Sequence, residues 1–276
     1  MKVLRHRIHT PEGERLPFEG SPNRGGALVP RFLVMHYTAG ASARQSIDWL
    51  TNRDARASAH VVIGRDGAVT QLVPFDRVAW HAGRSRWEGL EGLNQHSIGI
   101  ELDNAGRLTR QGGQWRAWFG RAYDEDEVME ATHKHETATA GWHTFTPEQL
   151  EAARELATVL VRKYDLVDVI GHDDISPFRK SDPGPAFPLS NFRARLFGRR
   201  EDGPPRFATT VTLNIRTGPG TEHARLTEGP LPPGTEVEVL EAVGRWRFVD
   251  VVGSLRGTAH IQGWVHGGFL DRVADR

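Results

Sequence analysis

Short apolar runs separated by polar turns mark the strands expected in the first part of the chain. Residues 31–37 (RFLVMHY) form such a run, which is typical of a buried strand ending on a polar tip at His36. Residues 58–74 contain two β-rich runs joined around Asp66-Gly67, a dipeptide that favours a tight type I′ hairpin turn. Residues 97–103 (SIGIELD) predict a further strand.

Helical periodicity appears in two segments. The apolar positions of residues 43–53 fall on one helical face, and Ser42 is placed as the N-cap. A stronger signal opens at Thr146 as N-cap, with proline at N1 and Gln149 at the capping-box position, and predicts a helix to about Tyr164. Strands and helices therefore alternate, and the predicted class is α/β.

After this helix, residues 167–172 (VDVIGH) predict a strand, and the four prolines of residues 175–189 exclude regular structure from the loop that follows. Two other segments lack periodicity. We expect residues 1–30 to form an extended arm with little regular structure, and residues 104–145 to form an inserted, partly helical loop.

A change of pattern near residue 200 predicts two domains. Charge, glycine and proline cluster at 199–207, which indicates a linker after a first domain at 1–198. Residues 208–276 contain short strands separated by Gly/Pro turns, which predicts a small all-β barrel with Trp246 and Trp264 available for its core.

Composition narrows the possible partners and chemistry. Lys plus Arg (35) equals Asp plus Glu (35), so the basic field that nucleic-acid binding needs is absent, and we expect no nucleic-acid partner. No apolar run has the length of a secretory signal or of a membrane span, which needs about 18 residues. We therefore expect a protein that is cytoplasmic as synthesised and that can act on the cell wall after release by lysis or non-classical export. A monomer is the default expectation.

Cysteine is absent, so a metal site would have to use histidine and carboxylate ligands. The best candidates are His36 and His172, each at the end of an apolar strand, and Asp182 in the proline-stiffened loop. Asp173 and Asp174 are left out because adjacent residues on a turn point apart. From spacing alone, ordinary structural histidines remain an alternative.

Five segments carry a family resemblance: FLVMHYTAG, SAHVVIGRDG, AWHAGRS, SIGIELDN and GHDDISPFRKSDPGPAF. In this order they resemble the motif blocks of the type 2 N-acetylmuramoyl-L-alanine amidases. The resemblance implies a mixed central sheet flanked by helices, and hydrolysis of the amide between N-acetylmuramic acid and L-alanine in peptidoglycan or muropeptides. It also implies that His36, His172 and Asp182 bind one Zn²⁺, with Glu101 as general base and Lys180 stabilising the oxyanion.

The same resemblance suggests roles for residues around the metal. Trp80, His81 and Asn94 are candidate substrate contacts, although a structural role is equally open for Trp80 and Asn94. His60 is assigned to the scaffold. The segment 104–145 is longer than a minimal member of the family needs, and either walls the substrate groove or is a solvated insertion.

Residues 208–270 resemble the bacterial SH3-like module found beside cell-wall hydrolases, through the N-x-R-x-G-P start and the GWV end. The resemblance implies a wall-binding role, against the alternative of a packing domain without a ligand. For the whole chain, an endolysin, a recycling enzyme and an exported effector all fit. The alternative from another class is a non-catalytic peptidoglycan recognition protein, whose members typically lack a zinc ligand.

Overall fold

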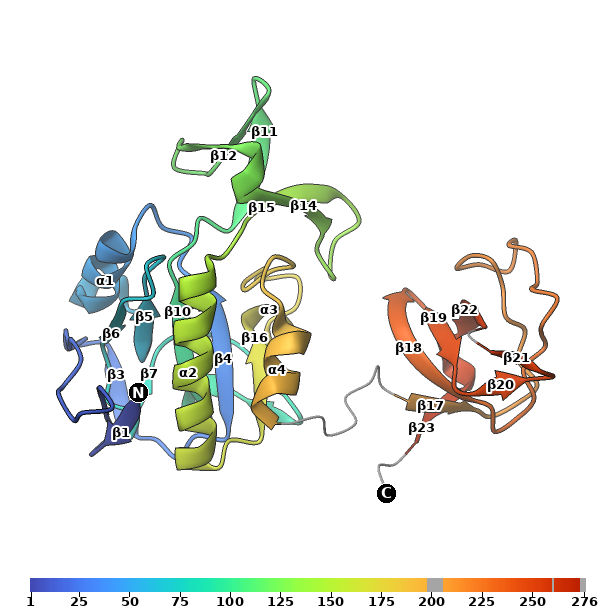
Figure 1. The fold of residues 1–276 in the computed structure, drawn as a ribbon, viewed down its shortest axis with the longest axis horizontal. Coiled ribbons are helices and arrows are strands. Elements are labelled where there is room, and N and C mark those ends of the chain that lie inside the picture. Colours follow the sequence, from blue (N-terminus) through green and yellow to red (C-terminus); the bar gives the residue numbers. More distant parts are fainter. Residues whose placement is uncertain (198–205, 260, 274–276) are drawn as a thin grey trace. The chain divides into compact units, whose positions relative to one another are not determined.

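The structure is a computed structural model that describes residues 1–197, 206–259 and 261–273 (Figure 1). The chain forms two compact units, Met1–Gly198 and Arg199–Arg276. Arg206 and Phe207, assigned above to the linker, belong instead to the first strand of the second unit, and linker positions 199–205 lie outside the described residues. No helix in the described ranges combines the length and apolar character needed to cross a bilayer.

A five-stranded mixed sheet forms the centre of the first unit and confirms the predicted α/β class. Its strands β16, β4, β10 and β5 are parallel, and β6 closes the edge antiparallel to β5. In spatial order the strands are β16 (Asp168–Gly171), β4 (Phe32–Tyr37), β10 (Ser97–Leu102), β5 (Val61–Ile63) and β6 (Val69–Gln71). Because the four parallel strands run the same way, their carboxyl ends share one edge, and this edge carries the site.

The connection between β5 and β6 differs from the predicted turn. Val61–Ile63 pairs with Val69–Gln71, which leaves a loop of residues 64–68. Within that loop only Gly67 has a positive φ, 79°. A type I′ turn requires two consecutive residues with positive φ, so the type I′ prediction is wrong. Asp66 instead stays in the ordinary region, and its Oδ1 accepts the amide of Ala68 at 3.0 Å.

Different helices cover the two faces of the sheet. Helix α2 (Pro147–Tyr164) and helix α4 (Leu189–Phe197) pack on the face that carries alternate apolar positions such as Leu33 and Ile100. Helix α1 (Ala43–Thr51) packs through Ile47 and Leu50 against Val62 on the opposite face. Since side chains alternate along a strand, His36 and Glu101 point to the face opposite α2.

The start of α2 shows a polar residue with an unexpected role. Thr146 caps the helix as predicted, and its hydroxyl accepts the amide of Gln149 at 3.2 Å. The side chain of Gln149 does not complete a capping box. It is fully buried, and its Nε2 donates to the carbonyls of Ile63 and Asp103, each at 3.0 Å. Gln149 therefore joins the helix to the carboxyl ends of β5 and β10.

The inserted segment 104–145 is a second sheet, so the prediction of a partly helical loop is wrong. Its five antiparallel strands, hereafter the inserted sheet, lie in the order β13 (Ala122–Tyr123), β12 (Gln114–Arg116), β11 (Arg107–Gln111), β15 (Thr139–His143) and β14 (Val128–Thr132). Leu108, Trp115 and Tyr123 give it a small core of its own. Spaced singly among charged residues, they leave no strand-like run in the sequence.

The N-terminal arm contains more regular structure than predicted. Strands β1 (Lys2–Leu4) and β2 (Arg7–His9) form a hairpin, and β3 (Arg24–Ala27) pairs with β7 (Arg77–Ala79). Val3 and Ile8 are buried in the α2 core, which holds the hairpin in place. The remaining short elements of the unit are η1 (Arg53–Ala55), β8 (Arg86–Trp87), β9 (Leu90–Glu91), η2 (Leu93–Gln95), η3 (Glu125–Glu127) and α3 (His172–Ile175).

The second unit is the predicted all-β barrel. Its antiparallel sheet has the order β22 (Gln262–His266), β19 (Trp246–Val251), β18 (Glu236–Val243), β17 (Arg206–Thr209) and β23 (Leu270–Arg272), with a β20 (Ser254–Leu255) and β21 (Thr258–Ala259) hairpin and the turn η4 (Gly267–Phe269). Aliphatic residues such as Ile215 and Val249 fill the core. Trp246 and Trp264 are only half-buried and lie outside it, so the core predicted for them is wrong.

Candidate metal centre and active site

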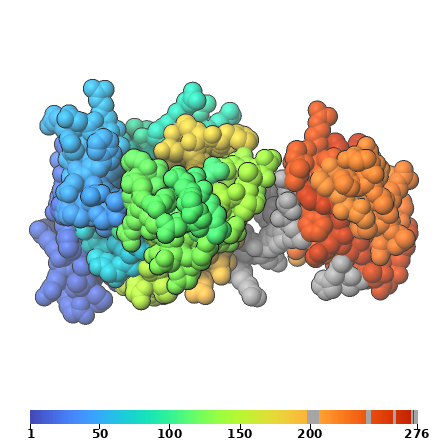
Figure 2. Space-filling view, turned by 90° about the horizontal axis from the view of Figure 1, so that it is seen from above, coloured from blue at the N-terminus to red at the C-terminus, as the bar shows by residue number. Residues whose placement is uncertain are grey.

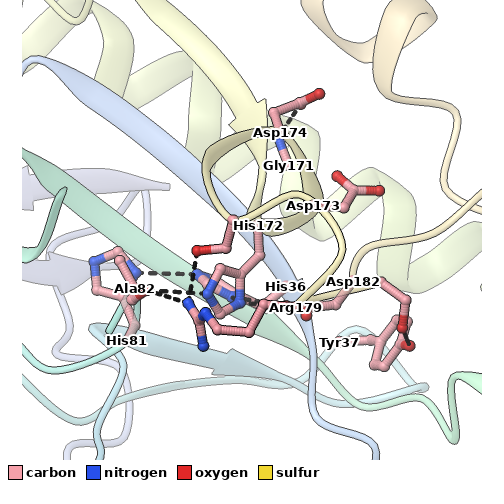
Figure 3. A network of polar contacts seen from close by, with 12 residues as sticks. His36, Tyr37, His81, Ala82, Gly171, His172, Asp173, Asp174, Arg179 and Asp182 are labelled. Carbon is pink, nitrogen blue, oxygen red and sulfur yellow. Dashed lines mark hydrogen bonds and ion pairs between the residues drawn. The ribbon is translucent and has the colours of Figure 1, made fainter. Parts of the chain in front are cut away.

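Two neighbouring strands bring the predicted ligands together. His36 is the penultimate residue of β4, and His172 follows β16 as the first residue of α3. Because Gly171 of β16 pairs with Met35 of β4, the two histidines emerge side by side. Asp182 reaches the same point from the proline-rich loop. Its Oδ2 lies 2.9 Å from Nδ1 of each histidine, and the two Nδ1 atoms are 3.0 Å apart (Figure 3).

These three atoms suit one small divalent cation. Two imidazole lone pairs that face each other at 3.0 Å cannot satisfy each other, and a cation placed among them accepts both, together with the carboxylate. In a tetrahedral zinc site, ligand atoms at about 2.1 Å from the metal lie about 3.4 Å apart. All three side chains are buried. The donor set is therefore of the kind that holds Zn²⁺ with a fourth position left for water.

The second nitrogen of each histidine is held by a hydrogen bond. Nε2 of His172 donates to the carbonyl of Ala82 at 3.2 Å. Nε2 of His36 faces Nδ1 of His81 at 3.0 Å, and Nε2 of His81 lies 3.4 Å from the carbonyl of Ser97. If each Nε2 carries the proton, every contact is satisfied and both Nδ1 lone pairs stay free. Such outer contacts set the tautomer and orientation of metal-binding histidines.

Room for His81 depends on Gly99 in β10. A Cβ at this position would lie 2.6 Å from Nδ1 of His81, closer than real Cβ contacts come. The absence of a side chain on Gly99 lets the imidazole lie directly against the sheet beneath His36. His60, which directly precedes β5, helps to fix this strand, because its Nδ1 accepts the amide of Gly99 at 3.0 Å.

Burial sets the protonation of this cluster. It lowers the pKa of His36 to about 4, with a further contribution from His172, and it lowers the pKa of His81 well below the usual value. For Asp182 burial acts in the opposite direction, but the neighbouring His172 and His36 outweigh it and hold the pKa of the carboxyl group below its usual range. His36 is therefore neutral and Asp182 is ionised at neutral pH, the forms that bind a metal.

Glu101 lies beside the ligands. It pairs in register with His36 on the adjacent parallel strand, so the two side chains point to the same face. Within the described residues its Oε2 is buried and has no hydrogen-bond partner. Burial raises the pKa of Glu101 well above the usual value, the nearby charge of Asp182 adds to this, and Lys180 opposes it. A carboxyl group in such surroundings is suited to taking up and releasing a proton during a reaction.

Lys180 lies at the outer side of the same site. Its side chain is exposed, and its charge lowers the pKa of both Glu101 and His36, which places it in the field of the cluster. Its neighbour Arg179 is a contact that the sequence did not reveal. The Arg179 guanidinium donates to the carbonyl of Ala82 at 3.0 Å, the same carbonyl that accepts from His172.

The three predicted substrate contacts lie in different environments. His81 is buried and occupied by His36 and Ser97. Asn94 is half-buried, and its Oδ1 accepts the amides of His81 and Ala82 at 3.0 and 2.7 Å, which fixes the backbone that holds both metal-binding histidines. Trp80 is exposed and leans over Gly25 of β3. Substrate contact by these residues stays a prediction, while His81 and Asn94 have clear positioning roles.

A tyrosine next to a ligand also helps to position the site. The hydroxyl of Tyr37 lies 2.7 Å from the hydroxyl of Ser181, which connects the residue after His36 to the residue before Asp182. Burial raises the pKa of Tyr37 to about 12, so the phenol stays protonated. Nothing in the sequence marks the pair, because the two positions are 144 residues apart.

The inserted sheet is anchored close to both histidine ligands. At one end the indole Nε1 of Trp118 donates to the carbonyl of Ala39 at 2.8 Å, in the loop after His36. At the other end Lys134 and His133 contact the carboxylate of Asp173 at 2.8 and 3.0 Å, directly after His172. Figure 2 shows the inserted sheet (green) next to the blue segment that contains α1 and next to the yellow segment that follows β16.

This fold and site define an α/β protein that can hold a single metal ion beside a carboxylate of raised pKa. Residues 26–185 match the N-acetylmuramoyl-L-alanine amidase family, so the chain belongs to that family. Residues 211–271 match the bacterial SH3 domain. Both resemblances drawn from the sequence are thereby confirmed.

Individual relatives agree with this assignment. The chain is 33% identical to the 1,6-anhydro-N-acetylmuramyl-L-alanine amidase AmpD of Citrobacter freundii over 141 residues, which cover 50% of this chain and 57% of the relative. It is 35% identical over 187 residues to the N-acetylmuramoyl-L-alanine amidase AmiD of Escherichia coli (strain K12), covering 64% and 57%. The chain thus spans little more than half the length of either relative. The crystal structure of a selenomethionine AmpD derivative aligns with a TM-score of 0.50 and 26% identity, covering 71% of this chain and 99% of that one.

Proposed function

We propose that the chain is a zinc-dependent N-acetylmuramoyl-L-alanine amidase that releases stem peptides from muropeptides or peptidoglycan. The observation that carries the proposal is the convergence of Nδ1 of His36, Nδ1 of His172 and Oδ2 of Asp182 within 3.0 Å, beside the carboxyl group of Glu101. When bound, Zn²⁺ would polarise the scissile carbonyl and lower the pKa of a water molecule. The relatives named AmpD and AmiD support the same activity.

The residues of the chain account for the proton transfers. Hydrolysis adds water across the C–N bond between the lactyl carboxyl of muramic acid and the nitrogen of L-alanine. Glu101 takes a proton from the attacking water on its buried carboxylate and returns it to the leaving nitrogen, a task suited to its raised pKa. Lys180 supplies positive charge from the solvent side as negative charge develops on the carbonyl oxygen. A free amino group on L-alanine and a free lactyl carboxylate result.

The decisive test compares purified peptidoglycan treated with three samples: wild-type protein, protein stripped by a chelator and then restored with zinc, and Glu101→Gln. Mass spectrometry should detect free stem peptides that begin with L-alanine in the wild-type and restored samples only. Release by the stripped protein would refute the metal requirement. Release by Glu101→Gln at the wild-type rate would remove Glu101 from the reaction.

The test also separates the alternative of a non-catalytic recognition protein. Such a protein would bind muropeptides and release nothing, even with zinc. The complete ligand set disfavours this alternative, because a binding protein has no need to orient two histidines and a carboxylate towards one point. For the second unit we propose wall binding, which would raise the local concentration of the enzyme on an insoluble polymer.

A further inference from the structure

A cleft of about 600 Å³ opens beside Glu101, on the side of the sheet away from β16. Helix α1 forms one wall through Gln45 and Trp49. The tip of the inserted sheet forms the other wall through Trp118 and Phe119. Glu101 lines the cleft and pairs in register with His36 on the neighbouring strand, so a molecule in the cleft would lie next to the metal site.

Two tryptophans in this cleft expose most of their surface. Trp49 is 58% exposed and Trp118 is 80% exposed, although large apolar side chains of this kind are normally covered. Trp118 is nevertheless held in place. Its Nε1 donates to the carbonyl of Ala39, and its ring meets that of Phe119 edge to face at 5.6 Å. A fixed, exposed indole is preorganised to stack on a ligand with an apolar face.

The charge of the cleft narrows the choice of ligand. Among the described residues that line the cleft, Glu101 is the one charged residue. A second cleft of about 600 Å³, near the β16 end, is instead lined by Lys134, Asp173, Asp174 and Arg193. The substrate of the proposed amidase has two unlike arms, a neutral saccharide and a stem peptide that carries carboxylates. A cleft whose lining carries no charged residue besides Glu101 and includes exposed indoles matches the saccharide. Saccharide C–H faces stack on aromatic rings, and hydroxyl and acetamido groups can bond to amides such as that of Gln45.

We propose that the cleft between α1 and the inserted sheet binds the β-1,4-linked N-acetylhexosamine saccharide next to the muramoyl residue that carries the scissile amide. This inference rests on the proposed amidase function. It makes the inserted sheet a specificity element that favours substrates with at least one further sugar over a single muramoyl peptide.

A binding experiment tests the cleft independently of catalysis. Chitotetraose is titrated into the full-length wild-type protein and into Trp118→Ala, Trp49→Ala and Met129→Ala, with the heat of binding recorded by calorimetry. Met129 is the control, because it is 43% exposed on the same inserted sheet and does not line the cleft. Truncating an aromatic residue at the centre of a binding site should weaken affinity about tenfold. We expect this loss in both tryptophan variants and wild-type affinity in Met129→Ala.

A kinetic experiment tests the specificity. The quantity measured is kcat/KM for release of the stem peptide from a muramoyl peptide with one sugar and from the corresponding disaccharide peptide. Wild-type protein should favour the disaccharide, and Trp118→Ala should lose about tenfold on the disaccharide while staying within about twofold on the single sugar. Trp118→Phe, which keeps a ring at the position, should retain most of the preference and guards against a folding defect.

The outcomes distinguish the two proposals. No release from either substrate, with chitotetraose still bound in a Trp118-dependent way, would refute the amidase function and leave the saccharide site standing. Equal kinetic losses on both substrates, or chitotetraose affinity unchanged by both tryptophan variants, would overturn the saccharide site even if the protein is an active amidase.

Discussion

Replacing His81 by phenylalanine should weaken metal binding although His81 is not among the expected ligands. The substitution keeps a ring of similar size against Gly99 and removes the acceptor that Nε2 of His36 faces at 3.0 Å. His36 is buried, so its N–H would be left without a partner. Leaving a buried donor unsatisfied costs about 1 to 3 kcal/mol, and loss of such an outer contact typically lowers metal affinity about 10- to 100-fold. The two estimates agree, since about 1.4 kcal/mol corresponds to a factor of ten.

The assay is competition for zinc between the protein and a chromophoric chelator at pH 7.5, with circular dichroism to confirm that each variant is folded. His60→Phe is the matched control. His60 is a buried histidine whose ring lies 5.8 Å from that of His81, and it bonds to Gly99 and Arg77 without touching a ligand. The His60→Phe variant should have a lower free energy of unfolding. Its zinc affinity should stay within about threefold of wild type, since the substitution removes no outer contact of the metal site. Wild-type zinc affinity in His81→Phe, or an equal loss in His60→Phe, would refute the reasoning.

Three further predictions concern the framework. Gln149→Leu removes the donor to the buried carbonyls of Ile63 and Asp103 and should cost about 2 to 4 kcal/mol in urea denaturation; a loss below about 1 kcal/mol would show that these carbonyls need no donor. Burial lowers the pKa of His60 to about 4 in the folded protein, against about 6.5 in the unfolded chain. The contribution of neutral His60 to the free energy of unfolding is therefore fully present above about pH 6.5. It is lost as the pH falls towards 4, by about 3 kcal/mol. His60→Gln should therefore flatten the pH dependence of the unfolding free energy, and an unchanged slope would contradict this. Ile215→Ala should destabilise the second unit by about 2 to 5 kcal/mol. The variant should release less stem peptide from insoluble peptidoglycan and as much as wild type from soluble muropeptides. Equal losses on both substrates would contradict separate roles for the two units.

The parts of the fold that sequence predicted well are those with a dense local signal. The apolar run that ends at His36 predicted a buried strand, and the Thr146 cap with its proline predicted the start of α2. The inserted sheet was missed because its core residues Leu108, Trp115 and Tyr123 are single apolar positions among charges. Their burial depends on strand pairings between distant residues, which local periodicity does not contain.

The residues of the site fall into the same two groups, those with a signal in the local sequence and those without one. His36, His172 and Asp182 were found because residue type and strand ends restrict the choice, and family motifs then added Glu101 and Lys180. The supporting contacts were not found, since a bond such as that between Tyr37 and Ser181 arises only when separate segments meet in space. The one exception is Gly99. A glycine within an apolar strand suggests that another group approaches closely, although not which one.

The contacts of Asp173 depend on the inserted segment, and this dependence bears on how the sequence evolved. This carboxylate is 3% exposed, and the side chains that contact it, His133 and Lys134, both belong to the inserted segment. Removing the segment would take both contacts away from this carboxylate, one position from His172. Homologues without the insertion should therefore carry an uncharged residue at the position of Asp173. Insertion length and the identity of that residue are expected to change together during evolution.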